Sequence, residues 1–235
     1  MSLAISILIG VAGLFAGSVI WNAASNQTSG DSLLGAPGQG GGFAPWTPFV
    51  AFFTAPNQPR ARWRIPFELL MGVYWGIAAH KHESRLDLAA VLVFSFPLGI
   101  ILLVDLWTRF IHTNLIMAGA IAGLGFAAAD SSDALLRSFG GMIVAALVFA
   151  LFFVLAMVMY RNARVVPFGL GDVYLAAMIG AMVRIGFIAP ALFLGIVLGG
   201  VSLVTLLLLK RVSRRQAVAY GPYLCLGALI TLLVW

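Results

Sequence analysis

The sequence predicts an all-α membrane protein, a polytopic bundle of about eight transmembrane helices. Hydrophobic residues make up 62% of the 235-residue chain and charged residues only 9%, whereas a soluble domain of this size needs a much more polar surface. Several apolar runs, such as 88–106, 142–160 and 187–209, have about the 20 residues that a helix needs to cross roughly 30 Å of hydrocarbon. Polarity does not alternate along these runs, which argues against a transmembrane barrel.

The predicted spans follow one another closely except after the first. The first run lacks a basic leading segment and a small-residue cleavage site, so we expect it to remain as a span. A long polar stretch at 22–65, rich in Gly and Pro, follows it and cannot hold regular secondary structure over much of its length. We therefore divide the chain into 1–65, the first span with this loop, and 66–235, the main membrane domain. The predicted spans are 3–21, 66–80, 87–106, 112–129, 134–160, 172–184, 187–209 and 217–235.

The basic residues predict the orientation of the spans. With both termini outside, ten of the 14 Lys and Arg residues fall in cytoplasmic loops, as the positive-inside rule requires. The sixth span is short, but a re-entrant segment there would turn the basic cluster at 210–215 outward, so we expect a crossing. Arg60, Arg62 and Arg64 are expected at anionic lipid headgroups. The net charge of +6 is thus explained by membrane topology, and no nucleic-acid partner is expected.

The single cysteine, Cys225, lies in the apolar terminal segment. One cysteine cannot form a disulfide framework or a cysteine metal site within the chain. No metal is therefore expected.

Two acidic residues stand at predicted span ends in settings that suggest chemistry. Asp105 ends the third span, and Asp172 opens the sixth, directly after Gly169-Leu170-Gly171. The predicted topology puts both on the cytoplasmic side. Two carboxyl groups that share a proton can activate a water with one member and polarise a peptide carbonyl with the other. The pair therefore predicts an aspartyl peptidase site.

The glycines and the helix start allow two interpretations of Asp172. Gly169 and Gly171 would permit a tight turn and a close approach by a substrate strand. An aspartate at a helix start is, however, often only a cap, which the helix dipole favours, and an aspartate at a span end is often only solvated. Each acid alone is a weak signal, and their shared position makes a stronger one.

With these motifs the chain resembles the type IV prepilin peptidases, polytopic aspartyl proteases with a Gly-x-Gly-Asp motif, over nearly its whole length. Asp105 with Arg109 is similar to the first motif of the family. Gly169-Leu170-Gly171-Asp172 is similar to the second. Further similar segments are 17–22 at the end of the first span, 64–72 at the entry to the second, and 220–227 at the start of the last.

The resemblance implies an endopeptidase of the bacterial inner membrane. It would remove the leader peptide from prepilins or pseudopilins at the cytoplasmic face, with Asp105 and Asp172 as catalytic residues and no cofactor for hydrolysis. His112-Thr113 and Tyr174 depart from the family pattern, and the loop at 22–65 has no Cys-x-x-Cys motif. N-methylation of the product stays open, and S-adenosylmethionine would be a cofactor only if that activity is retained.

Two further residues are candidates for the approach of substrate, Glu68 and Arg109. Glu68 is also expected to pair with Arg64 at the (i, i+4) spacing. A proton-coupled transporter that uses the same aspartates is the alternative function. It predicts acids near mid-span and repeats of similar topology, whereas these acids lie at span ends and no repeat is evident. A noncatalytic subunit of a secretion apparatus is a third possibility.

Overall fold

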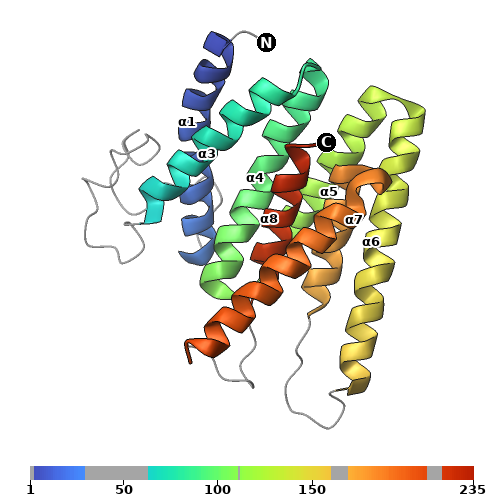
Figure 1. Ribbon diagram of the computed structural model, residues 1–235. Coiled ribbons are helices and arrows are strands. Elements are labelled where there is room, and N and C mark those ends of the chain that lie inside the picture. Colours follow the sequence, from blue (N-terminus) through green and yellow to red (C-terminus); the bar gives the residue numbers. More distant parts are fainter. Residues whose placement is uncertain (1–2, 30–62, 111, 160–168, 211–218) are drawn as a thin grey trace. The chain divides into compact units, whose positions relative to one another are not determined.

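The computed structural model describes residues 3–29, 63–110, 112–159, 169–210 and 219–235 (Figure 1). All regular secondary structure in these ranges is helical, so the predicted all-α class is confirmed. The described residues form α1 (Leu3–Ser29), α3 (Arg64–Lys81), α4 (Arg85–Thr108), α5 (Thr113–Asp130), α6 (Ser132–Met159), α7 (Leu170–Leu208) and α8 (Gly221–Leu232).

Five of the helices in the described ranges, α1, α4, α5, α6 and α7, are long and apolar enough to cross a membrane. Helix α3 has 18 residues but includes Arg64, Glu68 and Lys81. Helix α8 has 12 residues, and at about 1.5 Å per residue it falls well short of a hydrocarbon core of roughly 30 Å. The helices agree with a membrane protein, whereas a count of eight crossings stays a prediction.

Helix α7 covers the two separate spans predicted at 172–184 and 187–209, and it consists of two helices that meet at Arg184. It is one element of 39 residues in which Arg184 alone has non-helical dihedral angles, φ 61° and ψ 167°. Arg184 divides α7 into a first arm, 170–183, and a second arm, 185–208. Figure 1 shows the ribbon bending sharply here, so that the second arm turns back toward the end at which the first arm begins. The predicted break is therefore confirmed, whereas a separate membrane crossing by each arm stays a prediction.

The chain divides into two compact units, Met1–Trp107 and Thr108–Trp235. The first contains α1, α3 and α4, and the second contains α5 to α8. Each is described by itself below. The functional division that the sequence predicts at residue 65 concerns the loop that follows α1, and it stays a prediction.

In the first unit, α1 and α3 pack through glycines. A Cβ atom added to Gly13 would lie 2.7 Å from the backbone oxygen of Met71, and one added to Gly17 would lie 2.9 Å from the Cα atom of Glu68. On the facing helix, a Cβ atom added to Gly72 would lie 2.7 Å from a methyl carbon of Leu14. Small residues let helix backbones approach in this way where lipid offers no hydrophobic drive to associate.

In the second unit, the first arm of α7 packs equally closely on α5 and α6. Gly141 and Gly180 face each other with no room for a side chain on either, and a Cβ atom on Gly123 would lie 2.9 Å from the carbonyl carbon of Ala181. The hydroxyl of Ser138 donates a hydrogen bond to the backbone oxygen of Ala181. The first arm is thereby fixed against its neighbours along one buried face.

Helix α8 runs antiparallel to the second arm of α7. Close contacts join Tyr220 to Gly199, Leu224 to Gly195, and Gly227 to Ala191 and Gly195. At the far end, the guanidinium carbon of Arg184 lies 4.8 Å from the centre of the Trp235 ring. Trp235 thus lies at the end of the second unit at which α7 bends, which we call the kink end, and Tyr220 lies at the opposite end.

Candidate active site

Asp172 lies in the first turn of α7 and takes part in capping the helix. The helix begins at Leu170, two residues before the predicted start, and Gly169 is its N-cap with φ −98° and ψ 151°. One carboxylate oxygen of Asp172, Oδ2, accepts the N–H of Gly169 at 3.2 Å, and the N–H of Asp172 donates to the backbone oxygen of Gly169 at 3.1 Å. Asp172 caps the helix from the third helical position and is half-buried. The capping interpretation is therefore part of what this residue does.

The glycines before Asp172 are less constrained than expected. The φ angle of Gly169 is one that any residue adopts, and an added Cβ atom would meet only Asp172 Oδ2 at 3.7 Å and Gly171 N at 3.8 Å. Gly171 lies within the first helical turn and is half-buried. The backbone at Gly169 therefore does not require glycine, and the predicted tight turn is not the reason for this residue. Open access for a substrate backbone stays a prediction.

Asp105 lies in the last turn of α4 and is buried, with 4% of its surface exposed. It continues a buried stripe formed by Leu98, Ile101 and Leu102, which share one face of the helix at the spacing of three and four residues. All residues from Leu98 to Asp105 are buried, so α4 is enclosed on every side next to this carboxylate. The interior position makes its desolvation costly unless neighbouring groups compensate.

Arg109 ends α4. Its φ angle is 56°, the left-handed conformation that commonly terminates helices, and its side chain is exposed. A basic residue is favourable next to the carbonyl end of a helix. A role in substrate approach stays a prediction for this residue.

A buried polar group in the first unit joins α1 and α3, and we call it the Arg64 cluster. Arg64 Nε donates to Glu68 Oε1 at 2.7 Å, so the predicted (i, i+4) pair is confirmed. The other guanidinium nitrogens donate to Asn22 Oδ1 at 3.2 Å and to Ser18 Oγ at 2.6 Å. The side chains of Arg64 and Glu68 are 7% and 0% exposed. A role for Glu68 in holding substrate stays a prediction.

The placement of Arg64 at lipid headgroups is therefore wrong. Three buried acceptors surround its guanidinium, because α3 begins against α1 and draws the side chain inward. Arg60 and Arg62 lie outside the described residues. Ser18 and Asn22 are polar residues near the end of a long apolar helix, and this was the signal in the sequence that could have indicated a buried partner.

The Arg64 cluster lies at the Asp105 end of the first unit. The Trp21 ring, one residue from Asn22, lies 6.0 Å from Phe67 and 5.0 Å from Trp107, centroid to centroid. Trp107 follows Asp105 by two residues. The first unit therefore gathers Arg64, Glu68 and Asp105 at one end of its three helices.

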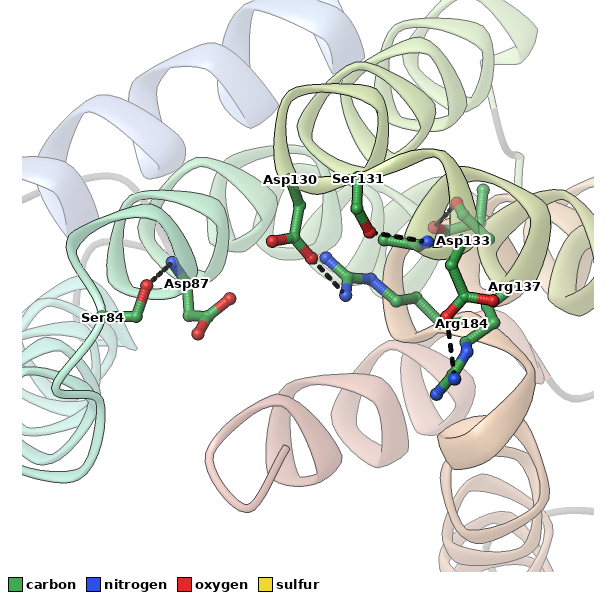
Figure 2. Close-up of polar contacts among 10 residues, drawn as sticks. Ser84, Asp87, Asp130, Ser131, Asp133, Arg137 and Arg184 are labelled. Carbon is green, nitrogen blue, oxygen red and sulfur yellow. Dashed lines mark hydrogen bonds and ion pairs between the residues drawn. The ribbon is translucent and has the colours of Figure 1, made fainter.

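Two ion pairs of the second unit lie at the opposite end from Asp172. Arg184 Nη1 lies 2.9 Å from Asp130 Oδ2, and Arg137 Nη2 lies 2.8 Å from Asp133 Oδ2. Figure 2 shows these pairs at the junction of α5 and α6, where Ser131 caps α6 through the N–H of Ala134 at 3.1 Å. The pair of Arg137 and Asp133 is 63% and 69% exposed. These contacts hold the kink end of the unit.

Asp105 belongs to the first unit and Asp172 to the second. Each carboxylate is therefore located within its own unit, one in the last turn of a helix and one in the first. Within the described ranges, His, Cys, Asp and Glu side chains form no group of three that could hold a metal ion.

Tyr220 is the residue at the Asp172 end that the motifs alone did not assign to the site. It directly precedes α8 and lies outside the five described helices that are long and apolar enough to cross a membrane. Burial, and after it the negative charge of Asp172, raise the pKa of the Tyr220 phenol to about 12. The two side chains therefore interact electrostatically within one unit.

Comparisons of the chain with protein-family models, with curated proteins and with solved structures find no match. The resemblance to prepilin peptidases accordingly rests on the motifs and on the positions described above.

Proposed function

We propose that the chain is a membrane-embedded aspartyl endopeptidase, with Asp105 and Asp172 as its catalytic pair. By the resemblance of its motifs, its substrates are type IV prepilins or pseudopilins, cut between the leader and the hydrophobic helix at the cytoplasmic face of a bacterial inner membrane. N-methylation of the product is left open.

The observation that carries the proposal is the position of the two acids at helix ends. Asp105 is in the last turn of α4 and buried, and Asp172 is in the first turn of α7 and half-buried. Helices α5 and α6 follow one another with Ser131 alone between them. If each crosses the membrane once, the chain returns to the side on which α4 ended, and both acids belong to that side.

Such a pair can hydrolyse a peptide bond without a cofactor. One carboxylate takes a proton from a water as the water oxygen bonds to the carbonyl carbon, and the other carboxyl gives its proton to the carbonyl oxygen. The carbon–nitrogen bond of this tetrahedral intermediate then breaks as the amine takes up a proton from the pair. The new carboxyl product loses a proton to the pair, which again holds one proton.

The end positions also favour a peptidase over a proton-coupled transporter. Acids that carry protons across a membrane lie where they connect both sides, whereas Asp105 and Asp172 both lie within a turn of a helix end. A substrate whose cleavage site lies next to its own hydrophobic helix would meet the enzyme at this depth.

The test is leader removal in membranes by Asp105→Asn and Asp172→Asn, with Asp133→Asn as the matched control at an exposed position. Loss of a general acid or base costs roughly 10²–10⁴-fold in rate, so each of the first two variants should lose cleavage by at least that amount. The control should cleave at the rate of the unmodified protein. Cleavage that persists in either of the first two variants at the control rate would remove that acid from the proposed pair.

A further inference from the structure

Tyr220 is held in place by its backbone at the start of α8. Its carbonyl oxygen accepts the N–H groups of Tyr223 and Leu224 at 3.1 and 3.4 Å, and Pro222 occupies the first turn of the helix, where its fixed φ favours helix initiation. The side chain of Tyr220 is half-buried. The backbone from which the ring projects is therefore fixed by the helix that follows it.

The ring of Tyr220 rests on the second arm of α7. A Cβ atom added to Gly199 would lie 2.8 Å from Cε2 and 3.3 Å from Cζ of this ring. The next residue, Gly200, has no atom within 4 Å of an added Cβ. The absence of a side chain at Gly199 is therefore what lets the phenol lie against the helix.

The kink at Arg184 returns the second arm to the level of Asp172. Asp172 precedes Arg184 by twelve residues and Gly199 follows it by fifteen, which correspond to about 18 and 22 Å along the two arms. The lengths differ by less than one helical turn. The phenol that rests on Gly199 therefore lies at the Asp172 end of the unit, in agreement with the charge of Asp172 acting on it.

The phenol can serve there as a hydrogen-bond donor. With a pKa near 12, the group keeps its proton at neutral pH. The N–H of Gly169 donates to Oδ2 of Asp172 from the same helix. A peptide carbonyl bound next to Asp172 can compete for the Tyr220 proton.

We infer that Tyr220 is a third catalytic residue of the Asp172 site, and that its phenol donates a hydrogen bond to the carbonyl oxygen of the scissile peptide bond. This inference rests on the proposed function. The hydrogen bond strengthens as negative charge develops on that oxygen during attack by water, which is when a fixed donor accelerates the reaction most.

The first experiment measures the placement of the Tyr220 phenol and does not depend on enzymatic activity. A fluorinated tyrosine whose phenol ionises near neutral pH is introduced at position 220, and its ionisation is followed by absorbance in the unmodified protein and in Asp172→Asn. A negative neighbour disfavours the phenolate, so its removal should lower the pKa of the probe by roughly half a pH unit or more. Asp133→Asn, at the opposite end of the unit, should leave the pKa unchanged. An equal pKa in all three proteins would overturn the placement.

The second experiment measures catalysis by Tyr220→Phe. Its matched control is Tyr223→Phe, three residues further along α8. Removal of one oxyanion donor costs about 10²–10³-fold in kcat, so Tyr220→Phe should lose a factor of this order with KM nearly unchanged. Gly199→Ala should lower kcat in the same direction by displacing the ring, whereas Gly200→Ala should not.

The outcomes separate the two proposals. Full activity in Tyr220→Phe would overturn the donor role and leave the peptidase intact. Cleavage that persists in Asp172→Asn would contradict both the proposed peptidase mechanism and the donor role of Tyr220, whatever pKa the probe shows. A rise in KM with kcat unchanged would show that Tyr220 only binds substrate, and this result would likewise contradict the inference.

Discussion

Arg64 and Glu68 of the first unit are buried with polar partners, whereas the pair of Asp133 and Arg137 in the second unit is exposed and Asp172 is half-buried at a helix start. In the first unit, Arg64 and Glu68 are enclosed with Ser18 and Asn22 between α1 and α3. In the second, Asp133 and Arg137 form an exposed pair at the start of α6, and the half-buried Asp172 bonds to backbone at the start of α7.

This difference indicates two ways to set up a carboxylate in a membrane protein. A buried network depends on every member, because a charge left without its partner in a medium of low dielectric is costly. A carboxylate at a helix N-terminus is instead supported by backbone N–H groups and the helix dipole. We therefore expect the end of the first unit that holds Asp105 to be the more sensitive to substitution.

The largest effect should follow from removing Glu68. Glu68→Ala removes the carboxylate that pairs with the buried Arg64, and the loss of one member of a buried pair costs about 3–5 kcal/mol in the free energy of unfolding. Asp133→Ala removes the corresponding acid from the exposed pair of the second unit and should cost about 1 kcal/mol or less. Equilibrium unfolding in mixed micelles measures both. Equal costs would contradict the contrast between the units.

A smaller effect should follow from filling the glycine contacts of the first unit. In Gly13→Ala the new methyl group would lie 2.7 Å from the Met71 oxygen and 2.9 Å from the Gly72 Cα atom, so the helices must separate, at a cost of about 1–3 kcal/mol. Gly125, in α5, has nothing within 4 Å of an added Cβ. Gly125→Ala should be neutral or stabilising by up to about 1 kcal/mol through helix propensity. Destabilisation by both would show that the loss is not one of packing.

The smallest effect concerns the kink of the second unit. Arg184 has φ 61° and ψ 167°, a conformation that costs a non-glycine residue about 1–3 kcal/mol, and it is held by Asp130 and Trp235. Both Arg184→Gly and Arg184→Ala lose these contacts, so their difference isolates the backbone. The glycine variant should be the more stable by about 1 kcal/mol.

The control for the kink is Ala189→Gly, an exposed position in the second arm of α7. Glycine there should be the less stable residue by about 1 kcal/mol. Thermal unfolding in detergent compares the four proteins. A preference for alanine at position 184 would mean that the backbone there is helical in solution.

Much of the helical fold could be predicted from the sequence because apolar length alone carries the signal. The long helices α4, α5 and α6 agree with their predicted bounds to within two residues. Helix α7 was expected to break near Arg184, and the kink that divides it into two arms falls there. Helix α8 is shorter than its predicted span, since Tyr220 is its N-cap and Leu233 its C-cap.

The polar contacts were predictable only where they are local. The pair of Arg64 and Glu68 follows from helical spacing, whereas Ser18 and Asn22 are 46 and 42 residues from Arg64. Their approach depends on how α1 packs on α3. The interaction of Tyr220 with Asp172 likewise depends on the bend of α7 at Arg184. Contacts that depend on tertiary packing have no characteristic residue spacing by which the sequence could predict them.

The most direct test of the account is the separation of the two acids in the membrane. Asp105→Cys and Asp172→Cys are combined in a Cys225→Ala background and treated with a bifunctional thiol reagent only a few ångströms long. We predict an intramolecular crosslink between positions 105 and 172, and none when Asp133→Cys replaces Asp172→Cys. A double variant whose two thiols both react with the reagent yet never crosslink would contradict a shared catalytic water.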